Sequence, residues 1–157
     1  MAEKSLRPSR LDTWCWPLPD DFVAHNAEIF MNWTYFSLLI AGVLPVACAG
    51  IAKLGFKHYD NHNPRAWLAK QTGFRARANA AQSNGLEAFP FFAAGVLLAL
   101  LAGVEHGRID ALSIGFVVAR IAYIACYVAD RATLRSVVWS VRYGCTIALF
   151  VFAMQAS

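Results

Sequence analysis

The sequence predicts an all-α integral membrane protein built as a bundle of four transmembrane helices. Of its 157 residues, 58% are hydrophobic and only 15% are charged, whereas soluble globular chains carry about 25% charged residues. The apolar residues are concentrated in four segments, and each is long enough to provide the roughly 20 helical residues that cross a bilayer. Polar stretches that contain arginine and lysine separate these segments.

Four helices follow a polar extension. Residues 1–32 are interrupted by prolines and show no signal-peptide pattern, and their tryptophans are compatible with an interfacial position. We therefore divide the chain into the extension 1–32 and a four-helix domain at 33–157. Within that domain, apolar segments bounded by polar residues predict helices at about 33–52, 74–104, 109–129 and 134–153. A polar connection follows the first helix, and short turns follow the second and third.

The positions of the basic residues predict how the chain crosses the membrane. Cytoplasmic loops carry an excess of lysine and arginine. Eight basic residues flank the first and third loops: Lys53, Lys57, Arg65, Lys70, Arg75, Arg77, Arg131 and Arg135. We therefore expect this side to face the cytoplasm, across the inner membrane if the cell is bacterial, with both termini on the opposite side. The net charge of +4 then reflects loop charges, and we expect no nucleic-acid partner. The cysteines show no metal-ligand spacing, so no metal site is predicted.

Several charged residues interrupt the apolar segments at matching depths. A charged side chain at a membrane helix centre costs about 2.5–3.5 kcal/mol on insertion scales. With a rise of about 1.5 Å per residue, Asn84 lies about 10 Å and Glu87 about 15 Å beyond Arg77. Measured from the same side, Arg120 lies about 16 Å deep and Arg142 about 10 Å deep. Helical spacing also places these residues in stripes with neighbouring aromatic side chains, which predicts a polar cleft open to the cytoplasm.

This cleft has the groups needed to bind glutathione. Guanidinium groups bind carboxylates in a bidentate manner, and Glu87 suits an ammonium group or a pairing with Arg120. Glutathione has two carboxylates, one ammonium group and one thiol, and a nearby arginine lowers the pKa of such a thiol from about 8.5. Two simpler interpretations stay open. Glu87 and Arg120 form only a buried ion pair, or Lys53, Arg75 and Arg142 extend their charges to the membrane surface.

The same residues resemble those of the MAPEG family, membrane-associated proteins in eicosanoid and glutathione metabolism. The second helix has the pattern R-…-N-x-x-E-x-x-P, and the resemblance spans about residues 33–155. Its residues are Arg77, Asn84, Glu87 and Pro90, then Arg120, Tyr123 and Tyr127, then Arg135 and Ser136. The resemblance implies a homotrimer that binds glutathione between subunits near the cytoplasmic side.

The resemblance also implies a role for each site residue. Arg135 corresponds to the arginine that stabilises the thiolate, with Ser136 as a hydrogen-bond donor beside it. Trp139 corresponds to an aromatic residue that borders the thiol, and Lys53 to a basic residue at the end of the first helix. The remaining positions correspond to glutathione contacts: Arg77, Asn84, Glu87, Arg120, Tyr123 and Tyr127. Two positions depart from the family pattern, because Ala80 and Ser83 stand where eukaryotic synthases often carry further arginines.

Together these features predict a glutathione-dependent transferase or isomerase, with peroxidase activity as a further expectation. The predicted partners are the lipid bilayer, a lipophilic electrophile and other copies of the chain. Two alternatives remain open at the level of sequence. One is a non-catalytic lipid-binding membrane protein, like the adaptor within the same family. The other is a small transporter that uses Glu87 and Arg120, although the sequence lacks the pair of broken helices found in many transporters.

Overall fold

The computed structural model describes residues 33–55 and 59–157, and our predictions for residues 1–32 lie outside this part of the chain. The described part contains one short helix, α3, and four long ones. Each long helix is long and apolar enough to cross a membrane. This confirms the predicted fold. The elements in chain order are α2 (Trp33–Ala52), α3 (Pro64–Ala69), α4 (Gly73–Leu101), α5 (His106–Val128) and α6 (Ala132–Ala156).

The helix ends differ slightly from those predicted. The first span agrees at both ends, but α4 ends at Leu101, because the turn that follows needs Gly103 in the left-handed region at φ 73°. The third span begins at His106, three residues before its predicted start. The short helix α3 is absent from our prediction, although Pro64 in its first turn is a residue typical of helix starts.

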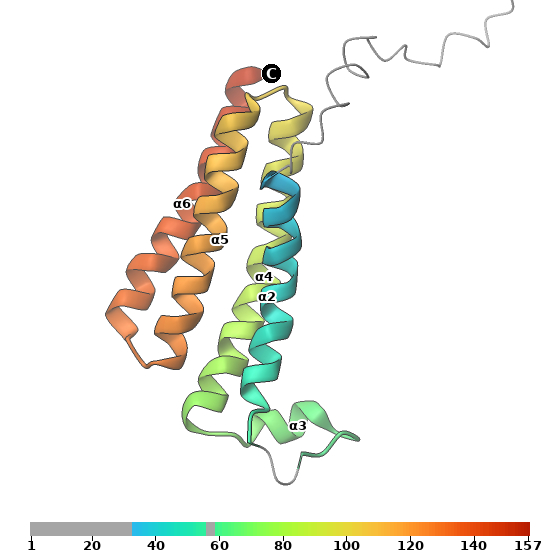
Figure 1. Ribbon diagram of the computed structural model, residues 1–157, viewed down its shortest axis with the longest axis vertical. Coiled ribbons are helices and arrows are strands. Elements are labelled where there is room, and N and C mark those ends of the chain that lie inside the picture. The colour runs from blue at the N-terminus through green and yellow to red at the C-terminus, as the bar shows by residue number, and fades with distance from the viewer. Residues whose placement is uncertain (1–32, 56–58) are drawn as a thin grey trace, which may run out of the picture. The chain divides into compact units, whose positions relative to one another are not determined.

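Four helices pack into a bundle around a shared apolar core. α2 contacts α4 and α5, and α6 contacts the same two helices, while α4 and α5 also touch each other. Figure 1 shows α2 beside α4 and α5 beside α6. At the centre, the rings of Phe92 and Phe116 stack with their centroids 3.7 Å apart, and both side chains are buried. Ala41 and Leu149 bring α2 and α6 into the same core.

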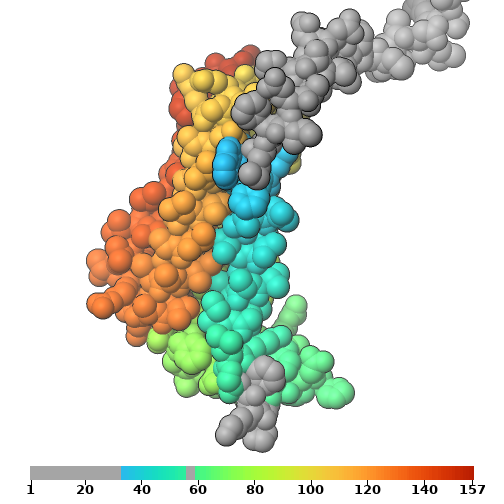
Figure 2. Space-filling view, viewed as in Figure 1, coloured from blue at the N-terminus to red at the C-terminus, as the bar shows by residue number. Residues whose placement is uncertain are grey.

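The outside of the bundle carries many large apolar side chains. Figure 2 shows the face formed by α2 and α5, and large exposed hydrophobic side chains occur on all four long helices, among them Leu39, Leu97, Val118 and Met154. A soluble protein rarely exposes so much contiguous apolar surface, whereas hydrocarbon tails solvate it. The protein is therefore an integral, multi-pass membrane protein, as the sequence predicts.

Two arginines in the first turns of α4 donate hydrogen bonds to carbonyl groups at the C-terminal ends of two neighbouring helices. Arg75 donates hydrogen bonds to the carbonyl of Leu54, with N–O distances of 3.2 and 3.0 Å. Its side chain therefore caps α2 and does not simply extend to the membrane surface. Arg77 donates to the carbonyl of Val128 at the end of α5, at 3.2 and 3.1 Å. Cations near a helix C-terminus also interact favourably with the helix dipole.

These contacts gather several basic residues at one end of the bundle. In Figure 1 this end carries α3 and the turn between α5 and α6. We call it the basic end and define it by Arg75, Arg77, Arg131 and Arg135. It corresponds to the side for which we predict a cytoplasmic orientation.

Candidate functional site

Arg120 is a buried polar residue that joins two helices. Its side chain comes from α5 and is 2% exposed. One guanidinium nitrogen donates to the Oδ1 atom of Asn84 at 2.8 Å, and another donates to the carbonyl of Ala81 at 2.6 Å. Gly85 leaves room for this group, because a Cβ atom there would lie 2.6 Å from the guanidinium. The two predicted site residues Arg120 and Asn84 therefore contact each other directly.

Glu87 does not pair with Arg120 within one chain. Its side chain is exposed on the surface of α4, and the described residues show no ion pair for either group. Arg120 lies level with Ala81 and Asn84 of α4, as its hydrogen bonds to them show, but Glu87 does not face it. A helix has about 3.6 residues per turn, so Ala81 and Asn84 face α5 while Glu87 points to a different side. The interpretation of Glu87 and Arg120 as a buried ion pair is thus wrong for the single chain.

A line of two arginines with two tyrosine rings between them runs from Arg120 toward the basic end. The guanidinium carbon of Arg120 lies 4.9 Å from the ring centroid of Tyr123. The rings of Tyr123 and Tyr127 meet edge to face at 5.4 Å. Arg135 from α6 then lies over the Tyr127 ring, 4.4 Å from its centroid. Each contact is of the cation–π or aromatic type that fixes side-chain orientation.

A hollow of about 440 Å³ lies between α5 and α6 along this line. It contains five of the residues that the sequence analysis selected and one, Ser140, that it missed. Spacing gives a signal for Ser140, because it lies one helical turn after Ser136. The two serine hydroxyl groups donate to the carbonyls of Ala132 and Ser136, at 3.2 Å each. The lining residues are Tyr123, Tyr127, Arg135, Ser136, Trp139 and Ser140.

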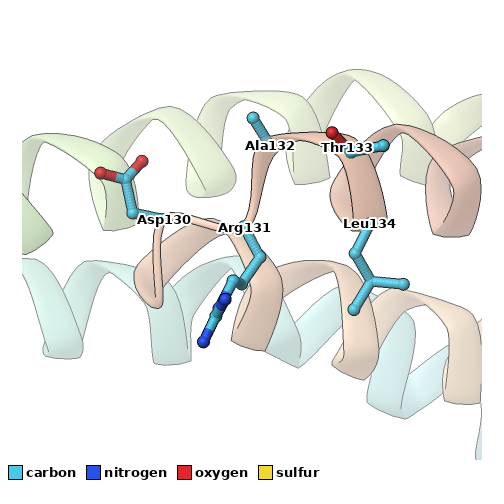
Figure 3. A pocket seen from close by; sticks show the side chains of 5 residues that line it. All are labelled: Asp130, Arg131, Ala132, Thr133 and Leu134. Carbon is cyan, nitrogen blue, oxygen red and sulfur yellow. The ribbon is translucent and has the colours of Figure 1, made fainter.

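A second hollow, of about 450 Å³, adjoins the first at the turn between α5 and α6. Residues 130–134 line it. Figure 3 shows Arg131 and Leu134 projecting to one side of the turn, away from Asp130. Asp130 instead faces Arg77, with a nitrogen–oxygen distance of 3.5 Å. None of the predicted site residues lines this hollow. Its lining includes Arg131, whose cation lies at the basic end.

Two other predicted site residues lie outside both hollows. Arg77 caps α5, and its side chain is 30% exposed. Lys53, just past the end of α2, places its ammonium group 4.5 Å from the ring centroid of Tyr59. Neither of them lines the hollow between α5 and α6. Within one chain, then, the predicted residues form three groups: the hollow, the Arg120–Asn84 pair, and the half-buried Arg77 and Lys53 near one end of the bundle. Glu87 stands apart from all three, exposed on α4.

The chemistry of these groups fits a peptide with carboxylates and a thiol. Arg135 supplies a cation beside hydroxyl donors from two serines and two tyrosines, and charge-assisted hydrogen bonds to anions are the strong ones. The exposed carboxylate of Glu87 suits an ammonium group, but it faces outward from its own chain. An ion at that level of a membrane helix needs a partner. Glu87 is not among the residues that line this hollow.

Comparison with known proteins gives one match. The chain matches the model of the MAPEG family over residues 33–155. This range covers all the helices of the described part, apart from the last residue of α6. No curated protein and no solved structure matches the chain significantly.

Proposed function

Because the chain belongs to the MAPEG family, we propose that it is a membrane-embedded glutathione-dependent transferase or isomerase that acts on lipophilic electrophiles. The family contains both glutathione-dependent enzymes and non-catalytic members. The choice between an enzyme and a non-catalytic protein therefore depends on the residues of the site. One observation supports it above the others. The hollow between α5 and α6 combines Arg135, Ser136 and Trp139, which the sequence analysis assigned to the thiol, with Tyr123 and Tyr127, which it assigned to glutathione contacts.

Arg135 is the proposed source of thiolate stabilisation. Its guanidinium lies over the Tyr127 ring, 4.4 Å from the centroid, so its orientation is fixed before a ligand enters. When glutathione is bound, its thiol supplies the nucleophile. An adjacent arginine lowers the pKa of a thiol, and each unit of lowering corresponds to about 1.36 kcal/mol in favour of the thiolate. Ser136 is the proposed hydrogen-bond donor to the same sulfur.

The remaining polar residues are proposed to hold the peptide. Tyr123 and Tyr127 supply hydroxyl donors for carboxylates, with Arg120 stacked against the Tyr123 ring, and Glu87 supplies an acceptor for the ammonium group. Because Glu87 is exposed on its own chain, we propose that it acts in a homotrimer, as expected for the family, where it faces the hollow of a neighbouring subunit. Arg77 and Lys53 contribute positive charge at the basic end, which attracts the doubly carboxylated ligand.

The lipophilic substrate is proposed to enter from the bilayer. Trp139 lines the hollow and is 38% exposed on the outer surface of α6, so it borders both the site and the lipid. A bilayer concentrates apolar molecules, and an indole at this position offers them an apolar wall. The electrophilic carbon would meet the thiolate between Trp139 and Arg135.

Calorimetry with glutathione on the detergent-purified protein tests the proposal, followed by assays across a panel of aryl halides, enones and lipid hydroperoxides. We expect saturable glutathione binding and conjugation or reduction of at least one electrophile class. Absence of binding together with absence of turnover would contradict the proposal. Lipid binding that is indifferent to glutathione would then favour the non-catalytic alternative, and substrate flux in liposomes would favour the transporter.

A further inference from the structure

The proposed function assigns no role to Arg142, which is a buried cation. It lies within α6 and is 4% exposed. Among the described residues it forms no ion pair, and its Nε atom has no hydrogen-bond partner. Its neighbours are rings, with the guanidinium carbon 5.6 Å from the Phe116 centroid and 5.9 Å from that of Trp139. Burying a charge without an oppositely charged partner is costly, so this position is set up to accept an anion.

Trp139, which lines the hollow between α5 and α6, also adjoins Arg142, because its ring centroid lies 5.9 Å from the guanidinium carbon. Arg142 is seven residues beyond Arg135 on the same helix, which is about 10 Å farther from the basic end. Arg135 therefore lies near the polar mouth of the hollow. Arg142 is a second cation, behind the apolar wall of the hollow, and it has no ion-pair partner among the described residues.

We propose that Arg142 binds a carboxylate of a molecule held in this hollow and so determines which substrates the site accepts. A guanidinium suits a carboxylate because its planar donors match the two oxygens. Arg120 is less suited, since its guanidinium already donates to Asn84 and to the carbonyl of Ala81. The carboxylate belongs either to an acidic lipophilic substrate or to glutathione. The inference rests on the proposed function only in taking this hollow as the substrate site.

Matched binding measurements test this inference without turnover. The full-length protein in a nonionic detergent is titrated calorimetrically with 4-chloro-3-nitrobenzoate, with its methyl ester, and with glutathione. The variants are Arg142→Met, which keeps an apolar chain of similar length, and Arg142→Lys, which keeps the charge. The control is Arg108→Met, which removes an exposed arginine that pairs with Glu105 at the opposite end of the bundle.

We expect Arg142→Met to weaken binding of one carboxylate ligand by about tenfold or more, the effect of losing one hydrogen bond to a charged group. Ester binding should stay within about twofold, and Arg142→Lys should restore part of the loss. Loss confined to the benzoate assigns Arg142 to the electrophile, and loss confined to glutathione assigns it to the peptide. Arg108→Met should change neither.

Two results would overturn the inference. Equal losses for the benzoate and its ester would mean that Arg142 supports the shape of the hollow and does not recognise an anion. Unchanged affinities with a less stable oligomer would mean that its partner is a carboxylate of another copy, for which the exposed Glu87 is the available group. A protein that binds the benzoate through Arg142 but neither binds glutathione nor turns over any electrophile of the panel would contradict the proposed function and leave this inference intact.

Discussion

The guanidinium of Arg120 donates a hydrogen bond to the side-chain oxygen of Asn84 across 2.8 Å. This bond joins α5 to α4, and the Arg120 side chain is buried in the bundle. It also explains why a charged residue is compatible with that position, because two acceptors on α4 satisfy the guanidinium without a carboxylate. The carboxylate of Glu87, by contrast, is exposed on α4 and forms no ion pair among the described residues.

Replacing Gly85 by alanine should destabilise the bundle. The added Cβ atom would lie 2.6 Å from the guanidinium of Arg120 and 2.9 Å from the Pro45 side chain. Overpacking of this kind costs about 1–3 kcal/mol, so thermal unfolding in detergent should begin at a lower temperature. Gly144→Ala is the matched control, since no atom lies within 4 Å of its added Cβ. Equal melting temperatures for the two variants would show that Arg120 is not held where the structure places it.

Replacing Asn84 by leucine should cost stability through Arg120. The guanidinium would keep the Ala81 carbonyl as an acceptor but lose its side-chain partner, and a hydrogen bond to a charged group contributes about 1.5–3 kcal/mol. Unfolding in detergent, followed by circular dichroism, measures the loss. Asn79→Leu on the same helix is the control, because only its backbone carbonyl accepts a hydrogen bond in the structure, from Ser83. A larger loss for the control would contradict the assignment.

The fold could be predicted from the sequence because a helix needs a minimum length to cross the hydrocarbon core of a bilayer. Four apolar segments of about 20 residues admit few arrangements other than four spans, and the first span agrees at both ends. The ends of the others were less predictable, since they depend on local turn geometry such as that of Gly103. The caps formed by Arg75 and Arg77 depend on which helices are neighbours, and no pattern along the chain carries that information.

The candidate site could be predicted in part, because the regular spacing of a helix shows which residues share a face. Tyr123 and Tyr127 share a helical face, as do Arg135 and Trp139, and these faces line one hollow. Depth and helical spacing together misled us about Glu87, because neither establishes that side chains on two different helices face each other. Arg142 is the opposite case. Its interruption of an apolar span was visible in the sequence, but only the structure shows that it is buried without an anionic partner among the described residues.

Replacing Arg135 by alanine should raise the pKa of the bound glutathione thiol. A cation beside the sulfur favours the thiolate, so its removal shifts the thiolate population, and the rise of activity, to higher pH. A shift of one unit would reduce the thiolate fraction near neutral pH by up to about tenfold. The measurements are the ultraviolet absorbance of the thiolate and the pH profile of kcat.

The control for this variant is Arg131→Ala, which removes a neighbouring arginine that lies outside the hollow between α5 and α6. It should leave the thiol's pKa unchanged. If the thiolate absorbance is the same in wild type and Arg135→Ala, then Arg135 has no part in stabilising the thiolate.

Replacing Glu87 by glutamine should weaken glutathione binding through the ligand's ammonium group. Glutamine has nearly the same shape but no charge, so the expected loss is that of one charge-assisted contact, about tenfold in Kd. Calorimetry with glutathione and with an analogue that lacks the amino group separates this contact from general damage. The wild type should bind the analogue about as weakly as Glu87→Gln binds glutathione, and the variant should not distinguish the two ligands. Ser83→Ala, one helical turn away on the same exposed face, should retain wild-type discrimination. If Glu87→Gln still prefers glutathione over the analogue by the wild-type factor, the ammonium group binds elsewhere, and Glu87 must instead be assigned to the contact between subunits.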